Sequence, residues 1–298
     1  MKNYETNYRK ISIIAFVAIG IAAMMIPGAS LASTAYAHSG GKISHSGNVH
    51  QSVNHSNSIT SSNSGSGGSS DASINSQSNS ASNSADVHIH NGGHDKKSGG
   101  SGSYDKKGDN KKGDSVSHSG NVHQDITQSN SISASNSGSG GSATADLNTQ
   151  TNTATNTADV HIHNGGNNGG GQVWSGDSSG GSSISHSGNV HQSIDQSNSI
   201  TATNTGSGGS ATADLNTQTN TATNTADVNI HNHGDGSISH SGNVDQSITQ
   251  SNDISATNSP PPTLLTCLTG VVCSSADASL NSQSNNATNS ADVSISNH

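Results

Sequence analysis

The chain has 298 residues, of which 27% are hydrophobic and only 2% aromatic, and its formal net charge is −9. These few large apolar side chains cannot build a conventional globular core, because burying such side chains is what offsets chain entropy in ordinary domains. Lys and Arg number 10 against 19 Asp and Glu. This balance argues against nucleic acid as a partner, since phosphate recognition needs clustered positive charge.

The N-terminus has the pattern of a secretory signal peptide. Positive charges in the first ten residues precede an apolar run at 11–26, and small residues follow, ending at Ala37. The run is shorter than the roughly 20 residues that cross a bilayer, so cleavage after Ala37 is favoured over a retained anchor. We therefore expect residues 1–37 to be a signal peptide, the rest to be secreted or held at the cell surface, and no membrane span to remain after cleavage.

Two phrases recur four times along the chain. Ser-His-Ser-Gly-Asn-Val begins at Ser44, Ser117, Ser185 and Ser239, and Ala-Asp-Val follows later in each unit. Repetition of this length is typical of stacked architectures, in which one unit cannot bury its own faces. The predicted division has repeat units at 38–90, 116–163, 183–231 and 238–298, a flexible linker at 91–115, a Gly-rich linker at 164–182 and a short link at 232–237.

Residue types alternate strictly within each unit. In the second unit Val122, Gln124 and Ile126 occupy one phase while polar residues fill the other. Strict period-two alternation is the signature of β-strands, and no helical period competes with it. The expected fold is therefore all-β: a repeat β-solenoid, or stacked β-arches or hairpins, with flexible Gly/Ser-rich linkers. A single strand that ran through a whole half-repeat would be unusually long. Each half-repeat is therefore expected to bend into an arch or to pair with the other half as a long hairpin.

Amide side chains recur at the same phase as the small apolar residues. A buried Asn or Gln costs on the order of 1–3 kcal/mol unless its donors and acceptors are satisfied. Stacked rungs satisfy them, because identical amides about 4.8 Å apart donate to one another; the alternative is a polar, disordered tract. The residues predicted to form inward ladders are Gln124, Gln128, Asn130, Asn136, Gln150, Asn152, Asn156, Gln192, Gln196 and Asn198.

A longer motif spans the first half of the second unit: Gly120-Asn121-Val122-x-Gln124-x-Ile126-x-Gln128-x-Asn130-x-Ile132-x-Ala134. This motif resembles the curlin repeats of curli fibres, in which Gln and Asn face inward from stacked strand-turn-strand units and Ala and aliphatic residues fill between. The chain lacks that family's Gly between Gln and Asn, and it has Asn136 and Asn204 in place of the closing Gln, so the family's arch geometry is not carried over. The resemblance implies ladder positions at Gln128, Asn130 and Ala134, and at Gln196, Asn198 and Ala202 in the next unit.

Histidines close three of the units in pairs spaced i, i+2. On a strand such a pair shares one face, and stacked copies can present imidazoles to Zn²⁺, Ni²⁺ or Cu²⁺. The alternative interpretation is a solvated strand end. The candidate metal ligands are His88, His90, His161, His163, His231 and His233.

Aspartates recur at two places in each unit. Stacked like charges repel, which either favours a cation such as Ca²⁺ between rungs or keeps the sheet soluble, and the second interpretation is preferred. The two sets are expected to be Asp86, Asp159, Asp227 and Asp292, and Asp71, Asp146, Asp214 and Asp277.

Two further features bear on surface and stability. Thr-x-Thr arrays at 149–157 and 217–225 resemble the flat threonine faces of β-solenoid ice-binding proteins, although Ser replaces Thr in the outer units and β-propensity alone accounts for exposed Thr. Cys267 and Cys273 lie in an insertion at 260–273 and predict a local disulfide. The apolar residues of this insertion suggest a cap for the stack or a partner contact.

No catalytic constellation or cofactor motif is recognisable in the sequence. The favoured hypothesis is a non-enzymatic structural or adhesive extracellular protein, which joins other copies of itself or other surface components end to end in a fibre, surface layer or matrix. The alternative is an extracellular module that binds a divalent cation through its His and Asp columns. A lesser alternative is binding of ice or crystal surfaces through the Thr arrays.

Overall fold

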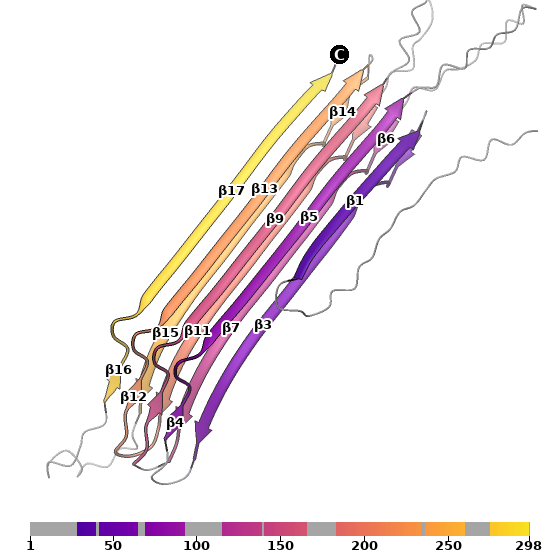
Figure 1. Ribbon diagram of the computed structural model, residues 1–298. Coiled ribbons are helices and arrows are strands. Elements are labelled where there is room, and N and C mark those ends of the chain that lie inside the picture. The colour runs from indigo at the N-terminus through magenta and orange to yellow at the C-terminus, as the bar shows by residue number, and fades with distance from the viewer. Residues whose placement is uncertain are drawn as a thin grey trace, which may run out of the picture.

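The computed structural model describes residues 29–39, 42–64, 69–92, 115–138, 140–165, 183–233, 236–259 and 275–297 (Figure 1). These segments form strands and turns, and the predicted all-β solenoid of stacked repeats is confirmed. No helix capable of crossing a membrane occurs in this part of the chain. The insertion with Cys267 and Cys273 and most of both long linkers lie outside the described residues.

Each repeat is one coil with two short and two long strands. The long strands have 15 to 17 residues and alternate with short strands of two or three. The strands of the four coils are β2 (Lys42–Ser44), β3 (Val49–Asn63), β4 (Ser70–Asp71) and β5 (Ser76–Gly92); β6 (Ser115–Ser117), β7 (Val122–Asn136), β8 (Ala143–Thr144) and β9 (Thr149–Gly165); β10 (Ser183–Ser185), β11 (Val190–Asn204), β12 (Ala211–Thr212) and β13 (Thr217–His233); and β14 (Ile238–Ser239), β15 (Val244–Asn258), β16 (Ala276–Asp277) and β17 (Ser282–Asn297).

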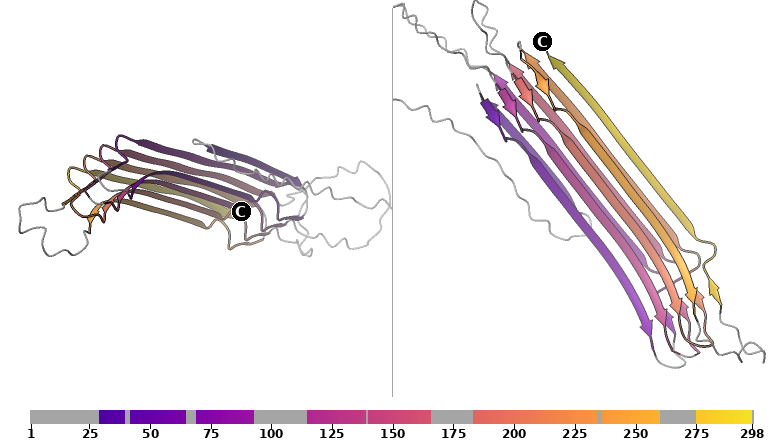
Figure 2. Two further views of the ribbon diagram at one scale, coloured as in Figure 1. Left: turned by 90° about the horizontal axis from the view of Figure 1, so that it is seen from below. Right: turned by 180° about the vertical axis from the view of Figure 1, so that it is seen from behind.

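Every strand pairs in parallel with the same strand of the neighbouring coil. The long strands build two facing sheets, β3-β7-β11-β15 and β5-β9-β13-β17, and the short strands build two narrow sheets at the coil's edges (Figure 2). The expected bend within each half-repeat and the expected hairpin between halves are wrong, because each half contains one unbroken long strand and the two halves lie in different sheets. Each unit as a whole is instead one arch of the stack. The long strands can run through a whole half-repeat because each forms its backbone hydrogen bonds with the same strand of the neighbouring coils, and not with the other half of its own unit.

An additional strand, β1 (Ala29–Ser39), extends one sheet beyond the first coil. It pairs in parallel with β5, from Ala29 opposite Ala81 to Ser39 opposite Asn91. Most of β1 belongs to the segment predicted to be the signal peptide. The edge of the first coil is thus covered, over this stretch, by residues that cleavage after Ala37 would remove.

The interior contains apolar layers separated by amide layers. One cluster of Val, Ile and Ala lies near the chain reversal at residues 43–49, a second rich in Ala lies near the opposite edge, and a third lies between them. Amides connect the two long sheets between these clusters, as where Asn130 Nδ2 donates to Asn152 Oδ1 at 3.0 Å. The small apolar residues let the sheets approach closely enough for these cross-sheet bonds.

The corners of the coil require left-handed backbone. His186 and Gly188 have φ of 50° and 68°, and the same pair of conformations recurs in all four coils. A Cβ at Gly188 would lie 3.1 Å from Ile230 Cδ1 and 3.2 Å from Ile162 Cδ1. Glycine is thus required for both its φ and its close approach to the core.

Candidate functional sites: the end faces and the histidine columns

The ten amides predicted to face inward are all enclosed by the coils. None of their side chains is more than 2% exposed, and each takes part in a ladder between coils or between the two long sheets. Ala134 and Ala202, implied by the family resemblance, are also fully buried. The structure therefore brings all these residues together in the interior.

The glutamine ladders have a direction. Gln192 Nε2 donates to Gln124 Oε1 at 2.8 Å, and Gln124 Nε2 donates to Gln51 Oε1 at 2.7 Å. Gln124 Nε2 also donates to the Thr157 carbonyl across the interior at 2.9 Å, which fixes which end of the amide carries nitrogen. In each glutamine column the later coil donates to the earlier one.

The asparagine ladders run in the opposite direction. Asn57 Nδ2 donates to Asn130 Oδ1 at 3.1 Å, Asn130 donates to Asn198 at 3.1 Å, and Asn198 donates to Asn252 at 3.0 Å. The columns that start at Asn63, Asn79, Asn83 and Asn91 repeat this direction. The two ends of the stack consequently differ in hydrogen-bonding character.

One glutamine column is interrupted in the first coil. His55 occupies the place of Gln128, opposite which it pairs in register. His55 is 6% exposed, and neither of its ring nitrogens, nor Gln128 Nε2, has a hydrogen-bond partner. Imidazole cannot reproduce the amide's donor and acceptor spacing, so the ladder stops at this point.

In the final coil, the side chains at inward-facing positions are exposed at the end of the stack. Val293 and Ile295 of β17 are 41% and 47% exposed, although their equivalents in the preceding coils are buried. The glutamines of β15 keep their donor bonds to the third coil, for example from Gln246 Nε2 to Gln192 Oε1 at 2.8 Å. This end face therefore presents apolar side chains, glutamine acceptors and asparagine donors.

At the other end of the stack the donor and acceptor roles are reversed. Gln51 Nε2, at the start of its column, donates to Ser33 Oγ of β1 at 3.2 Å. Asn57 Oδ1 lies at the start of an asparagine column. Because each asparagine in the column donates to the next coil, this oxygen is the atom that would accept a hydrogen bond from a preceding donor. The first coil thus offers glutamine donors and asparagine acceptors.

The histidine pairs predicted from the sequence form incomplete columns. His88 and His161 stack with ring centroids 5.0 Å apart, and each contacts a carboxylate of its own strand, Asp86 at 2.8 Å and Asp159 at 2.9 Å. In the third coil Asn229 takes the equivalent place. This column therefore ends after two coils.

The second predicted column does not continue as a regular stack. His90 and His163 stack at 4.9 Å, but His231 and His233 lie tilted to His163, at 6.4 and 5.0 Å. Burial lowers the pKa of His163, and the neighbouring His90, His233 and His231 lower it further.

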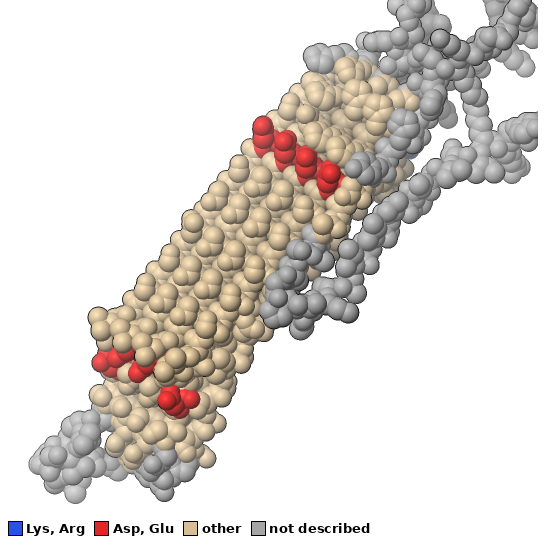
Figure 3. Space-filling model, viewed as in Figure 1, with Lys and Arg blue, Asp and Glu red and all other residues tan. Residues whose placement is uncertain are grey.

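Only one of the two expected aspartate columns exists. Asp86, Asp159, Asp227 and Asp292 lie in register, and Figure 3 shows a row of acidic side chains across one face. The second expected column is wrong: Asp71 pairs with Thr144 and Asp277 with Thr212, two residues before Asp146 and Asp214. The outer units read Asp-Ala-Ser where the inner ones read Thr-Ala-Asp, so matching the aspartates by type misplaced the register.

Asp146 is nevertheless surrounded by carboxylates. Burial raises its pKa, and the charges of Asp214, Asp71 and Asp277 raise it further. The Asp214 N–H, which donates to Asp146 Oδ1 at 2.8 Å, lowers it.

The Thr arrays of β9 and β13 lie on the outer surface, exposed or half-exposed.

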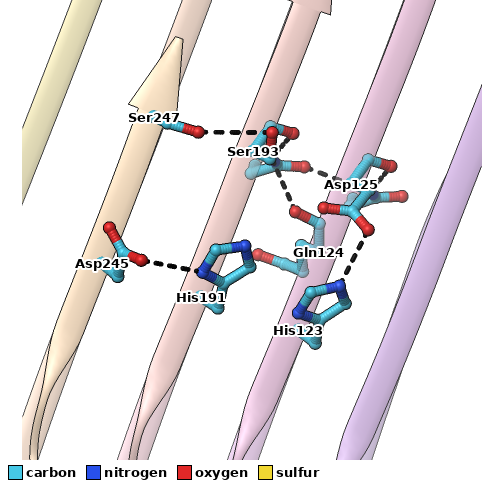
Figure 4. Close-up of polar contacts among 9 residues, drawn as sticks. His123, Gln124, Asp125, His191, Ser193, Asp245 and Ser247 are labelled. Atoms are coloured by element: carbon cyan, nitrogen blue, oxygen red, sulfur yellow. Dashed lines mark hydrogen bonds and ion pairs between the residues drawn. The ribbon is translucent and has the colours of Figure 1, made fainter.

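Sequence reasoning missed a third histidine column on the outer surface of the β3-β7-β11-β15 sheet. His50, His123 and His191 stack at 4.6 and 4.7 Å, and Asp245 continues the row, with His191 Nδ1 3.2 Å from its carboxylate (Figure 4). Asp125 lies beside this row, 2.8 Å from His123 Nε2. The signal was present, since a histidine follows Asn-Val in three of the four repeated phrases.

Comparison with known proteins gave no match: no family fits the sequence, and no curated protein and no solved structure is significantly similar to it.

Proposed function

We propose that this chain is a secreted structural protein whose copies join head to tail, coil 4 of one copy against coil 1 of the next, in an extracellular fibre, layer or matrix. The observation that carries the proposal is the opposite polarity of the two kinds of amide ladder. The proposal accords with the predicted signal peptide and with a surface built from repeated, in-register strands.

Ladder polarity favours one orientation of docking. The exposed end of coil 4 presents Gln246 Oε1 as an acceptor and Asn252 Nδ2 as a donor, whereas coil 1 presents Gln51 Nε2 as a donor and Asn57 Oδ1 as an acceptor. Head-to-tail contact continues both ladders. Contact between two coil 4 faces would instead set glutamine acceptors against acceptors and asparagine donors against donors wherever equivalent columns meet, which leaves buried polar atoms unsatisfied.

The end strands also match in sequence. At the interior phase β17 and β5 both read Gln, Asn, Ala, Asn, Ala, Val, Ile and Asn, beginning at Gln283 and Gln77. On the same register Val293 and Ile295 would stack on Val87 and Ile89 of the next copy. Burying these half-exposed side chains supplies a hydrophobic contribution to docking.

The strand β1 lies where the incoming copy would pair. It covers β5 from Ala81 to Asn91, and Ser33 accepts the hydrogen bond of Gln51 Nε2 that a docked Gln246 would otherwise accept. Cleavage after Ala37 would remove nearly all of β1. In this proposal assembly therefore begins only after the leader has been removed.

The test uses the secreted chain beginning at His38, examined by electron microscopy and fibre diffraction. We expect unbranched assemblies with a reflection near 4.8 Å along their axis. The variant Gln246→Lys/Asn252→Lys places two charges on the end face, and it should remain monomeric. The matched control, Ser247→Lys/Ser251→Lys, adds the same charges to the outer face of the same strand and should assemble normally.

Two results would contradict the proposal. One is a wild-type chain that stays monomeric at high concentration although circular dichroism reports β-structure. The other is equal assembly of the inward and outward lysine variants, because the end face would then not be the contact.

A further inference from the structure

The third histidine column departs from the repeat at one residue. Position 125 carries Asp, whereas the residues in register with it are Ser52 and Ser193, and the fourth coil has Ser247. Asp125 Oδ2 lies 2.8 Å from His123 Nε2 on its own strand, β7. The single acidic substitution thus falls beside the stacked histidines and nowhere else in that column.

Three potential ligands converge here from two strands. Ligand atoms of His123, Asp125 and His191 lie within 4.8 Å of one another, and among the described residues no other group of three or more His, Cys, Asp or Glu meets this criterion. The His123 and His191 rings are nearly parallel, inclined by only 7° with their centroids 4.7 Å apart, and they come from neighbouring strands (Figure 4). Both histidines line a shallow hollow in the surface, together with Asp245.

We infer that His123, Asp125 and His191 bind one first-row divalent transition-metal ion of the Zn²⁺ or Cu²⁺ class. Two imidazole nitrogens and one carboxylate oxygen suit these ions, whereas Ca²⁺ and Mg²⁺ prefer oxygen ligands alone. Bonds of about 2.0–2.1 Å in tetrahedral geometry place ligand atoms about 3.3 Å apart. The ligand atoms, all within 4.8 Å of one another, need small side-chain rotations to reach this spacing, and the side chains of His123 and Asp125 are 40% and 35% exposed.

Asp245 has a positioning role in this site. It accepts a hydrogen bond from His191 Nδ1, at 3.2 Å, which holds that proton on Nδ1 and leaves Nε2 to bind the metal. A carboxylate bound to the second nitrogen of a metal-binding histidine fixes its tautomer and orientation in this way. The site lies on the flank of coils 2 and 3 and does not depend on the end faces.

The test is calorimetric titration of the full secreted chain with Zn²⁺ and, separately, electron paramagnetic resonance with Cu²⁺. We expect one site per chain and a Cu²⁺ spectrum with two coordinated nitrogens. Asp125→Ser restores the residue of the other coils and should weaken binding at least about tenfold, as loss of a ligand does. Asp195→Thr removes a carboxylate from the next strand, restoring the residue that the second and fourth coils carry in register, and should leave affinity unchanged.

Three outcomes would overturn the inference. These are absence of binding by the wild-type chain, equal weakening by Asp125→Ser and Asp195→Thr, and loss of the site in His88→Gln/His161→Gln instead of in His123→Gln/His191→Gln. Equal weakening would indicate general electrostatic attraction, and the last result would assign the metal to the other histidine column. Assembly of the chain is measured separately, so its failure leaves this test intact.

Discussion

Gln124 is the central rung of one glutamine ladder and allows the energetics of the interior to be tested. Gln124→Met keeps the side chain's length but removes hydrogen bonds to Gln51 Oε1, the Thr157 carbonyl and Gln192 Nε2, of 2.7, 2.9 and 2.8 Å. Gln51 Oε1 then loses a donor inside the stack, at a cost of about 1–3 kcal/mol, while Gln192 Nε2 retains the Thr225 carbonyl. We expect the free energy of unfolding to fall by about 2–4 kcal/mol.

Replacing the whole column should cost less than this single change predicts. With Gln51, Gln124, Gln192 and Gln246 all changed to Met, no amide of the column is left without its partner, and such matched replacement is close to neutral. The assay is urea unfolding of dilute monomer followed by far-ultraviolet circular dichroism. A fourfold variant that loses about four times the single-variant free energy, or a single variant that loses none, would refute the ladder reasoning.

Three further predictions concern other buried or crowded groups. His55→Gln supplies an acceptor to Gln128 Nε2 and should raise the free energy of unfolding in urea by about 1–2 kcal/mol, and a decrease would contradict the ladder defect. The pKa of Asp146 is raised above 3.8 in the folded state, so the free energy of unfolding should fall as pH rises from 3.8 through the raised pKa. Asp146→Asn keeps the oxygen that accepts from the Asp214 N–H, and it should raise Tm at pH 7. Because the folded state lowers the pKa of His163 below 6.5, stability should be complete above pH 6.5 and decline as pH falls towards the lowered value, and thermal melts of His163→Gln should show a smaller decline.

The sequence determined the strand class and the inward phase. Period-two alternation is a local property, so it predicts Gln124 and Gln128 in the interior and Thr151 on the surface from the strand alone. The fourfold repetition likewise predicted stacking, because one coil with so few large apolar side chains cannot bury its own faces. The same information could not exclude a bend within each half, since the partners of a strand are not encoded locally.

Only the tertiary structure decided which residues of different coils lie against one another. The register between coils places Asp71 opposite Thr144 and not in line with Asp146. It also brings Asp125 and His191 together from β7 and β11, in which paired residues are 68 positions apart in the sequence. The direction of the amide ladders likewise depends on carbonyls of the facing sheet, such as that of Thr157. These relations arise from pairing between coils distant in the sequence, whereas alternation arises from the geometry of a single strand.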